Sequence, residues 1–122
     1  MNLIKNISKS EVHVLKDQVT YQEGQVVSKT LAQNDAVSIT LFAFDKDEAI
    51  STHESGGDAF VTCLDGVGRI TIDGVEYHVD YEDKRYRDLL QNLYTSRTGI
   101  RYEWFKEERG YKHWVLYNTE QF

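Results

Sequence analysis

Histidine and carboxylate side chains occur together in one short stretch of the sequence, at His53, Glu54 and Asp58. Neutral imidazole is a metal ligand and a general base near neutral pH, and a buried carboxylate takes part in either chemistry. A transition metal needs three or four such donors at about 2.0–2.2 Å. A second histidine, His113, follows Gly110 at the spacing Gly-x-x-His. Metal binding and acid–base chemistry are therefore the two chemistries that these residues offer.

Each of these residues also has an interpretation without chemistry. His53 can be a hydrogen-bonded structural histidine, and Glu54 and Asp58 can belong to a solvated loop. The single cysteine, Cys63, has no partner for an intramolecular disulfide and is interpreted as a buried core thiol. Because the first residues also lack an apolar run long enough for a signal peptide or a membrane span, we expect a cytoplasmic protein.

The length and composition restrict the classes of function. A chain of 122 residues predicts one domain, 1–122. Its net charge of −6 argues against nucleic acid as the main partner, because such binding depends on Lys and Arg neutralising phosphates. Glycine-rich phosphate loops, Cys-x-x-Cys and Gly-x-Ser-x-Gly do not occur in the sequence. Nucleotide-dependent and serine-hydrolase functions therefore have no support.

Short runs rich in Val, Ile, Thr, Phe and Tyr, with a period near two, extend from residue 11 to residue 83 and predict β-strands. Asp73-Gly74, between two of these runs, predicts a type I′ hairpin. Several short strands separated by turns favour an antiparallel sandwich or barrel. The strands are expected at Val12–Leu15, Tyr21–Leu31, Ala36–Phe44, Ser51–His53, Ala59–Leu64, Arg69–Ile72 and Val75–Val79.

The composition changes near Asp83. Residues 1–83 hold 6 basic and 15 acidic side chains, whereas residues 84–122 hold 8 basic and 5 acidic ones. The runs Ile100–Phe105 and His113–Tyr117 predict a C-terminal β-hairpin around a polar loop. An apolar stripe with helical spacing predicts a helix over 85–96, namely Tyr86, Leu89, Leu90, Leu93 and Tyr94.

One segment resembles the first conserved motif of the small single-domain cupins, namely Ile50-Ser-Thr-His53-Glu-Ser-Gly-Gly-Asp58-Ala-Phe-Val-Thr-Cys-Leu-Asp65-Gly66-Val-Gly-Arg-Ile-Thr-Ile-Asp73-Gly74. The earlier run Tyr21-Gln-Glu-Gly-Gln-Val-Val-Ser-Lys-Thr-Leu is similar to the usual start of that barrel. The resemblance covers about residues 18–80. It implies an all-β fold, a cupin-like antiparallel barrel or jelly roll, with residues 84–122 as a divergent C-terminal segment of helix and hairpin.

The resemblance also implies a metal site that this sequence keeps only in part. In the family, the first motif supplies His-x-His, a Glu and a Gly, and a second motif with a Pro supplies a further His. Here His53 is the one clear counterpart in the first motif, Asp58 stands one residue early for the carboxylate, and the chain contains no Pro. The implied cofactor is a divalent ion, Zn, Mn, Fe or Ni, held weakly by His53 with Asp58 or His113.

Three explanations fit a cupin-like first part with an unlike last part. The chain can be a divergent cupin that closes its barrel with the two C-terminal strands. It can carry an unrelated segment that packs over one end of the barrel. It can also have lost its reading frame near codon 83, which would leave a tail unable to complete the barrel and expose strand edges.

The function that the resemblance implies is a binding module for a small ligand in the barrel lumen, as a homodimer. His53 and an apolar wall of Val61, Cys63, Ile70 and Ile72 are the expected ligand contacts. A metal-dependent isomerase or oxygenase is one alternative, which the incomplete donor set argues against, and no catalytic residue is assigned. The other is a partner- or nucleic-acid-binding module that uses the basic, aromatic tail, namely Lys84, Arg85, Arg87, Arg97 and Arg101 among Tyr86, Tyr94, Tyr102, Trp104 and Trp114.

Overall fold

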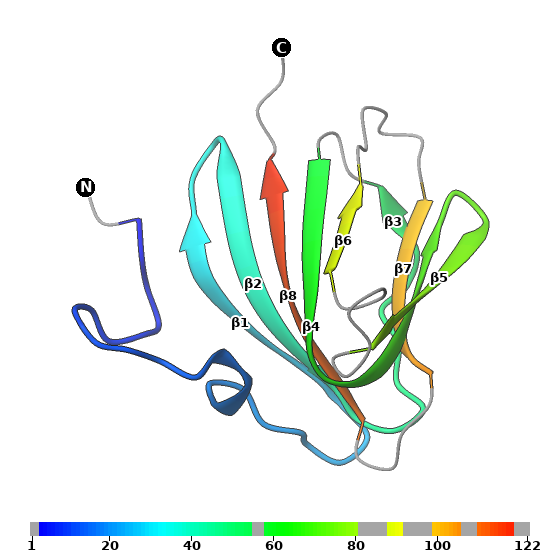
Figure 1. Ribbon diagram of the computed structural model, residues 1–122, viewed down its shortest axis with the longest axis horizontal. Coiled ribbons are helices and arrows are strands. Elements are labelled where there is room, and N and C mark those ends of the chain that lie inside the picture. The colour runs from blue at the N-terminus through cyan, green and yellow to red at the C-terminus, as the bar shows by residue number, and fades with distance from the viewer. Residues whose placement is uncertain (1–2, 55–57, 81–87, 92–98, 106–109, 119–122) are drawn as a thin grey trace.

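The computed structural model describes residues 3–54, 58–80, 88–91, 99–105 and 110–118. These residues form eight strands and one 3-10 helix (Figure 1). The elements are η1 (Leu15–Asp17), β1 (Val26–Gln33), β2 (Val37–Phe44), β3 (His53–Glu54), β4 (Asp58–Ile72), β5 (Val75–Asp80), β6 (Asp88–Gln91), β7 (Gly99–Trp104) and β8 (Tyr111–Asn118).

Strand β4 is the element that joins the two sheets of the barrel. The strand order is β1-β2-β8-β4-β7-β3, with β5 and β6 also paired to β4, and all pairs are antiparallel. The first half of β4 pairs with β8 and β6, and the second half pairs with β7 and β5. The two sheets therefore lie close together at the bend of β4 and diverge toward the other end of the molecule (Figure 1).

The bend in β4 depends on a glycine. The register with β8 shifts between Cys63 and Asp65, and Gly66 follows with φ +74°. A Cβ at this position would lie 1.9 Å from the carbonyl oxygen of Gly110, which no side chain can tolerate. Glycine therefore permits both the left-handed backbone and the close approach of the chain that precedes β8.

The turn between β4 and β5 is the predicted type I′ hairpin. Asp73 has φ 52° and Gly74 has φ +83°, which are the two positive values that this turn requires. Ile72 pairs with Val75 directly across it. The prediction from Asp73-Gly74 is confirmed.

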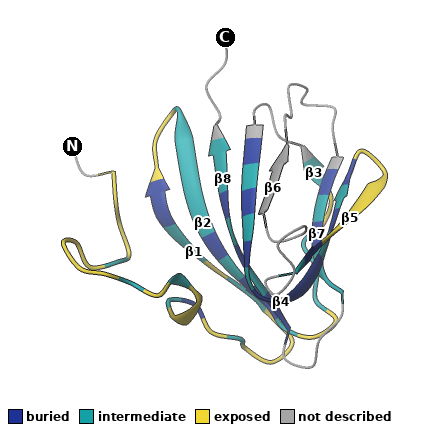
Figure 2. Cartoon of the chain, in the orientation of Figure 1, coloured by how far each residue is buried: buried dark blue, intermediate teal, exposed yellow. Residues whose placement is uncertain are grey.

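Apolar side chains form two buried clusters, one on each face of the sheet that contains β2 and β8. The inner cluster lies between the two sheets (Figure 2). The outer cluster contains Val19, Leu31, Leu41 and Ala43, with Ile7, Leu15 and Tyr21 of the N-terminal segment packed against it. Successive residues of β2 thus point to opposite sides, which explains why both faces of this strand are apolar.

The predicted strand Val12–Leu15 is wrong. Val12 is 98% exposed, and η1 begins at Leu15. The alternation of valines at 12 and 14 suggested a strand, but both side chains face solvent and this segment has no ladder partner along it. No helix in the described part of the chain has the length and apolar character of a membrane span.

The predicted helix over 85–96 is also wrong where it can be compared with the structure. Residues 88–91 form β6, which pairs with Ala59–Thr62 of β4. Pairing with the free edge of β4 outweighs the local helical spacing of the leucines. Residues 85–87 and 92–96 lie outside the described residues.

The two C-terminal strands occur where the sequence predicts them, as β7 and β8, but they do not form a hairpin. β4 lies between them, and β8 is paired on its other side with β2. A strand in the middle of a sheet is incompatible with a tail that fails to complete the barrel. Of the three explanations for the last part of the chain, the arrangement agrees with the divergent barrel that closes with these two strands.

Candidate functional site

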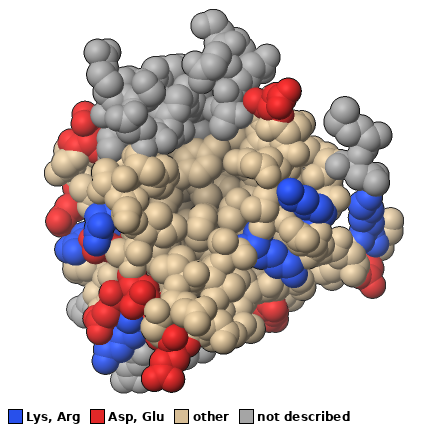
Figure 3. Space-filling model, turned by 180° about the vertical axis from the view of Figure 1, so that it is seen from behind, with Lys and Arg blue, Asp and Glu red and all other residues tan. Residues whose placement is uncertain are grey.

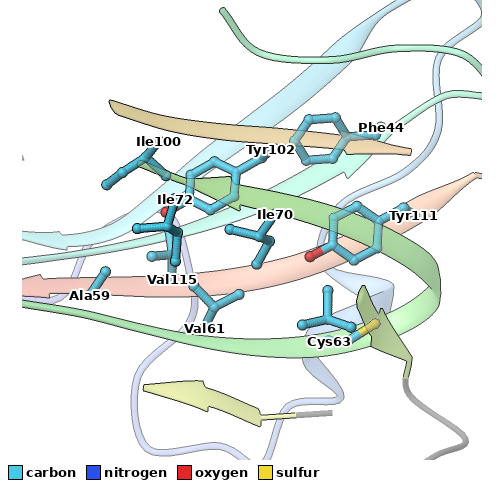
Figure 4. Packing of buried hydrophobic residues seen from close by; sticks show 11 residues of the cluster. Phe44, Ala59, Val61, Cys63, Ile70, Ile72, Ile100, Tyr102, Tyr111 and Val115 are labelled. Carbon is cyan, nitrogen blue, oxygen red and sulfur yellow. The ribbon is translucent and has the colours of Figure 1, made fainter. Parts of the chain in front are cut away.

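Strand β8 carries the polar side chains that face the interior between the two sheets. The alternation of a strand directs Tyr111, His113, Val115 and Tyr117 to one side. Tyr102 of β7 and Phe44 of β2 point into the same interior, as Figure 4 shows for both rings together with Tyr111. We define the interior site as the polar side chains of His53, Tyr102, Tyr111, His113 and Tyr117.

His113 is fully buried, and aromatic rings of β2, β7 and β8 lie around it. Its ring centroid lies 5.2 Å from that of Phe42, 4.8 Å from that of Tyr102 and 5.1 Å from that of Tyr111. Neither Nδ1 nor Nε2 has a hydrogen-bond partner among the described residues. Burial lowers the pKa of His113 from 6.5 to about 3, so the ring is neutral at pH 7.

The hydroxyl of Tyr111 is also buried without a hydrogen-bond partner in the described structure. Burial raises the pKa of this phenol well above its ordinary value. Its ring fits over Gly68 of β4, where a Cβ would lie 2.2 Å from Cζ of Tyr111. An unsatisfied buried polar group costs about 1–3 kcal/mol of stability, so three such atoms at one place need an explanation beyond the fold.

A second set of polar side chains lies toward the end of β8, and hydrogen bonds connect its members in a row. The hydroxyls of Tyr102 and Tyr117 are hydrogen-bonded to each other. Nε2 of His53 lies 3.3 Å from the hydroxyl of Tyr117, and Nδ1 of His53 lies 3.4 Å from the carbonyl oxygen of Ser51. One assignment satisfies every donor: Nδ1–H donates to the carbonyl, Nε2 accepts from Tyr117, and Tyr117 accepts from Tyr102.

The side chains in this row of hydrogen bonds become less buried from the interior toward solvent. Tyr102 is almost fully buried, whereas Tyr117 and His53 are only partly buried. Burial raises the pKa of Tyr117 to about 12, and burial, with a smaller contribution from Tyr117, raises the pKa of Tyr102 well above its ordinary value. Both phenols are therefore uncharged at neutral pH. His53 and Tyr117 form the partly exposed end of the site.

The predicted apolar contacts all lie in the inner cluster. Val61, Cys63, Ile70 and Ile72 are buried on β4, on either side of its bend. Sγ of Cys63 lies 3.4 Å from the carbonyl oxygen of Gly66. Cys63 is thus the buried core thiol of the simpler interpretation. Asp58 begins β4 opposite Asn118, and its side chain lies outside the described residues, as does that of Glu54.

Sequence analysis did not assign the three tyrosines to the site. The sequence contains a signal for two of them, because side chains alternate along a strand. Once His113 is placed inward, Tyr111 and Tyr117 point inward as well. Tyr102 had no such local signal. It joins the site because Ile70 of β4 pairs with it across the sheet.

Comparison with known structures shows the same barrel in other proteins. No protein-family model and no curated protein matches the chain. A conserved protein of unknown function from Streptococcus pyogenes is 27% identical, with a TM-score of 0.82 over 100% of this chain and 98% of that chain. A cupin superfamily protein from Desulfitobacterium hafniense is 26% identical, with a TM-score of 0.77 over 96% of this chain and 98% of that one. The chain is a cupin barrel.

A third neighbour of this cupin is part of a larger chain. The cupin 2 conserved barrel domain protein from Leptotrichia buccalis is 28% identical, with a TM-score of 0.71 over 84% of this chain and 45% of that one. The first neighbour matches along the whole of this chain, including the segment after residue 83. The likeness to known structures is therefore not confined to residues 18–80 but includes the C-terminal part of the chain.

The described side chains of this cupin include two of the expected metal ligands, His53 and His113, but not that of Asp58. No three His, Cys, Asp or Glu side chains come together within the described ranges. His53 bonds to Tyr117, which is two inward-facing positions beyond His113 on β8. Both imidazoles contact the Tyr102 ring, at centroid distances of 5.7 Å and 4.8 Å. The described rings nearest His113 are aromatic and come from β2, β7 and β8.

The described aromatic residues of the basic, aromatic tail pack against the buried clusters of the cupin. Tyr102 is buried in the interior, and Trp114 stacks on Phe60 at a centroid distance of 5.5 Å. Nε of Arg101 lies 3.4 Å from Oε2 of Glu103. The face of the molecule in Figure 3 shows basic and acidic side chains near one another, without a continuous basic stripe among the coloured residues. The basic side chains at 84, 85, 87 and 97 lie outside the described residues.

We expect Tyr117→Phe to destabilise the cupin more than Tyr102→Phe. Loss of the Tyr117 hydroxyl leaves that of Tyr102 buried without a partner, at a cost of about 1–2 kcal/mol. Loss of the Tyr102 hydroxyl leaves Tyr117 bonded to His53, and the cost is smaller. Urea unfolding of both variants measures the difference. Equal losses, or a larger loss in Tyr102→Phe, would contradict the assigned chain of hydrogen bonds.

Proposed function

We propose that this cupin binds a small molecule inside its barrel, at the interior site. The observation that carries the proposal is a group of three buried polar atoms that have no hydrogen-bond partner among the described residues, namely the two ring nitrogens of His113 and the hydroxyl of Tyr111. Buried polar groups in proteins are nearly always satisfied, and a bound ligand that supplies the missing partners explains why the sequence retains them.

The rest of the site is suited to the same role. Val61, Cys63, Ile70 and Ile72 provide an apolar wall, and the chain from Tyr102 to His53 leads from the interior to the partly exposed end. Pockets of this composition, largely apolar with a few convergent polar groups, are typical of ligand sites. The divalent metal expected from the family resemblance stays a prediction, because the side chain of Asp58 lies outside the described residues. The homodimer expected from the family resemblance stays a prediction.

The experiment is a fragment screen by protein NMR. The probes are single-ring acids, bases and amides, and the readouts are the ring resonances of His113 and Tyr111. We expect at least one fragment to shift both residues, with affinity reduced about tenfold or more in His113→Phe, because that variant lacks the two nitrogens. The matched control is His78→Phe, since His78 is an exposed histidine stacked on Phe105 at 4.1 Å.

Two results would overturn the proposal. One is that no fragment shifts the interior resonances, while native mass spectrometry of the purified protein shows no bound small molecule. The other is that fragments bind equally to wild type and to both His113→Phe and Tyr111→Phe, which would locate binding elsewhere.

A further inference from the structure

The hairpin strand β5 is exposed along most of its length. Val75 and Tyr77 are 54% and 37% exposed, although they point to the same side of the sheet as the buried Val79. Glu76 and His78, on the other side of the strand, are exposed as well. Figure 2 shows this hairpin as an exposed segment at the periphery of the molecule. Within the described structure, no segment covers β5 over these four exposed residues.

One edge of β5 offers backbone groups to a further strand. Among the described strands, β5 pairs only with β4. Ile72 and Val75 close the two-residue turn as a hydrogen-bonded pair, and such pairs alternate along an antiparallel ladder. The N–H and C=O groups of Tyr77 therefore point toward β4, whereas those of Glu76 and His78 point away from it. An unpaired edge of this kind is a template for the addition of another strand.

Two registers allow β5 to pair with a second copy of itself over five of its six residues. In both registers a two-fold axis relates the two strands, which run antiparallel. The register centred on His78 places Glu76 opposite Asp80 of the second copy, and like charges directly opposite each other are destabilising. The register centred on Tyr77 instead places Glu76 opposite His78 of the second copy. The sequence therefore favours the register centred on Tyr77.

The same register brings together the exposed apolar side chains of β5. It places the two Tyr77 side chains opposite each other, and each Val75 opposite Val79 of the second copy. Because the backbone groups of Tyr77 point toward β4, the two tyrosines form a non-hydrogen-bonded pair, in which side chains are closest. Aromatic pairs directly across two strands stabilise a sheet. One arrangement thus satisfies the free backbone groups and covers the exposed apolar side chains.

We propose that this cupin self-associates through the free edge of β5, as an antiparallel pair of two copies centred on Tyr77. The family resemblance implies a homodimer without an interface, and this proposal names one. Because the pairing strand has only six residues, the interface is small and the expected Kd is weak, about 100 µM. The inference does not depend on the proposed function, because the interior site contains no residue of β5.

Sedimentation velocity at concentrations from well below to well above about 100 µM measures the association. Tyr77→Lys should weaken it at least about tenfold, because two ammonium groups would lie directly opposite each other. The matched control is Val12→Lys, which adds the same charge at a valine that is 98% exposed. Val12 belongs to the N-terminal segment, on the other side of the molecule from β5 (Figure 1), so this variant should associate like the wild type.

Cysteine cross-linking tests the register independently. Tyr77→Cys places two thiols across the two-fold axis at a Cα separation of about 4.5 Å, which a disulfide can span. Val75→Cys is the matched control, because its two thiols would be four residues, or about 13 Å, apart along the paired strands. Mild oxidation should link Tyr77→Cys and not Val75→Cys, and the native Cys63 is buried in both.

The proposal is supported if Tyr77→Lys loses the association that Val12→Lys keeps, and if Tyr77→Cys is the variant that cross-links. A wild type that stays monomeric over the whole concentration range overturns it. A dimer that Tyr77→Lys leaves intact also overturns it, because the dimer then forms through another surface. Cross-linking of Val75→Cys in preference to Tyr77→Cys shows that the register is wrong. If Tyr77→Lys fails to fold, the two cysteine variants decide the question.

Discussion

Acidification from pH 7.5 to pH 5 is expected to reduce the free energy of unfolding by about 2 kcal/mol through His113 alone. In the unfolded chain a histidine takes up a proton as the pH falls through about 6.5. In the folded protein His113 stays neutral until the pH approaches its pKa of about 3. The unfolded state therefore binds more protons throughout this window, and stability decreases until about pH 3.

Urea unfolding at a series of pH values measures this effect, and His113→Phe provides the reference. The variant has no group that titrates at this position, so the difference between the two stability curves isolates His113. The other titratable side chains that face it are Cys63 and the phenols of Tyr102 and Tyr111, and burial raises the pKa of both phenols well above this range. His78→Phe should keep the acid sensitivity of the wild type. Parallel curves for wild type and His113→Phe would show that His113 is not buried in its neutral form.

Gly68→Ala is expected to destabilise the protein by about 3 kcal/mol or more, a large effect for the addition of one methyl group. The new Cβ would lie 2.2 Å, 2.3 Å and 2.5 Å from three carbons of the Tyr111 ring. That ring is fully buried between Phe44 and His113, with centroid distances of 5.4 Å and 5.1 Å, so it has no room to move aside. The backbone of β4 or other side chains of the interior site must therefore shift to make room for the methyl group, which destabilises the fold.

Gly74→Ala is the matched control. Nothing lies within 4 Å of a Cβ at Gly74, although its φ of +83° is unfavourable for alanine, so the expected loss is about 1 kcal/mol. If Gly68→Ala fails to fold, the double variant Gly68→Ala with Tyr111→Leu keeps the prediction testable. Removal of the ring should make the added methyl group much less costly. A Gly68→Ala protein as stable as Gly74→Ala would contradict the close packing of Tyr111 on β4.

Local sequence determined some elements of this fold, and these were predictable. The turn at Asp73-Gly74 needs only two residues that accept positive φ, and it forms as expected. The leucines at 89 and 90 have helical spacing, but a strand forms there because β4 offers an unpaired edge. The position of β8 beside β2 and β4, rather than beside β7, depends on contacts between distant parts of the chain. No pattern within a short window encodes such contacts.

The candidate site was predictable to the same limited extent. His53 and His113 stood out by residue type and spacing, and both belong to the interior site. The predicted metal set stays a prediction, because the side chain of Asp58 lies outside the described residues. Single residue types indicate which chemistry is available, but the hydrogen bonds that remain unmade appear only when the strands are placed together.

The order of the strands also has a consequence for biosynthesis. β8 lies between β2 and β4 in the sheet, yet it is the last strand of the described chain to be synthesised. Translation proceeds at about 5–20 residues per second, so β4 emerges several seconds before its neighbour exists. During that interval the facing edges of β2 and β4 have no partner. A growing chain paused before residue 111 is therefore the state most exposed to aggregation and most dependent on chaperones.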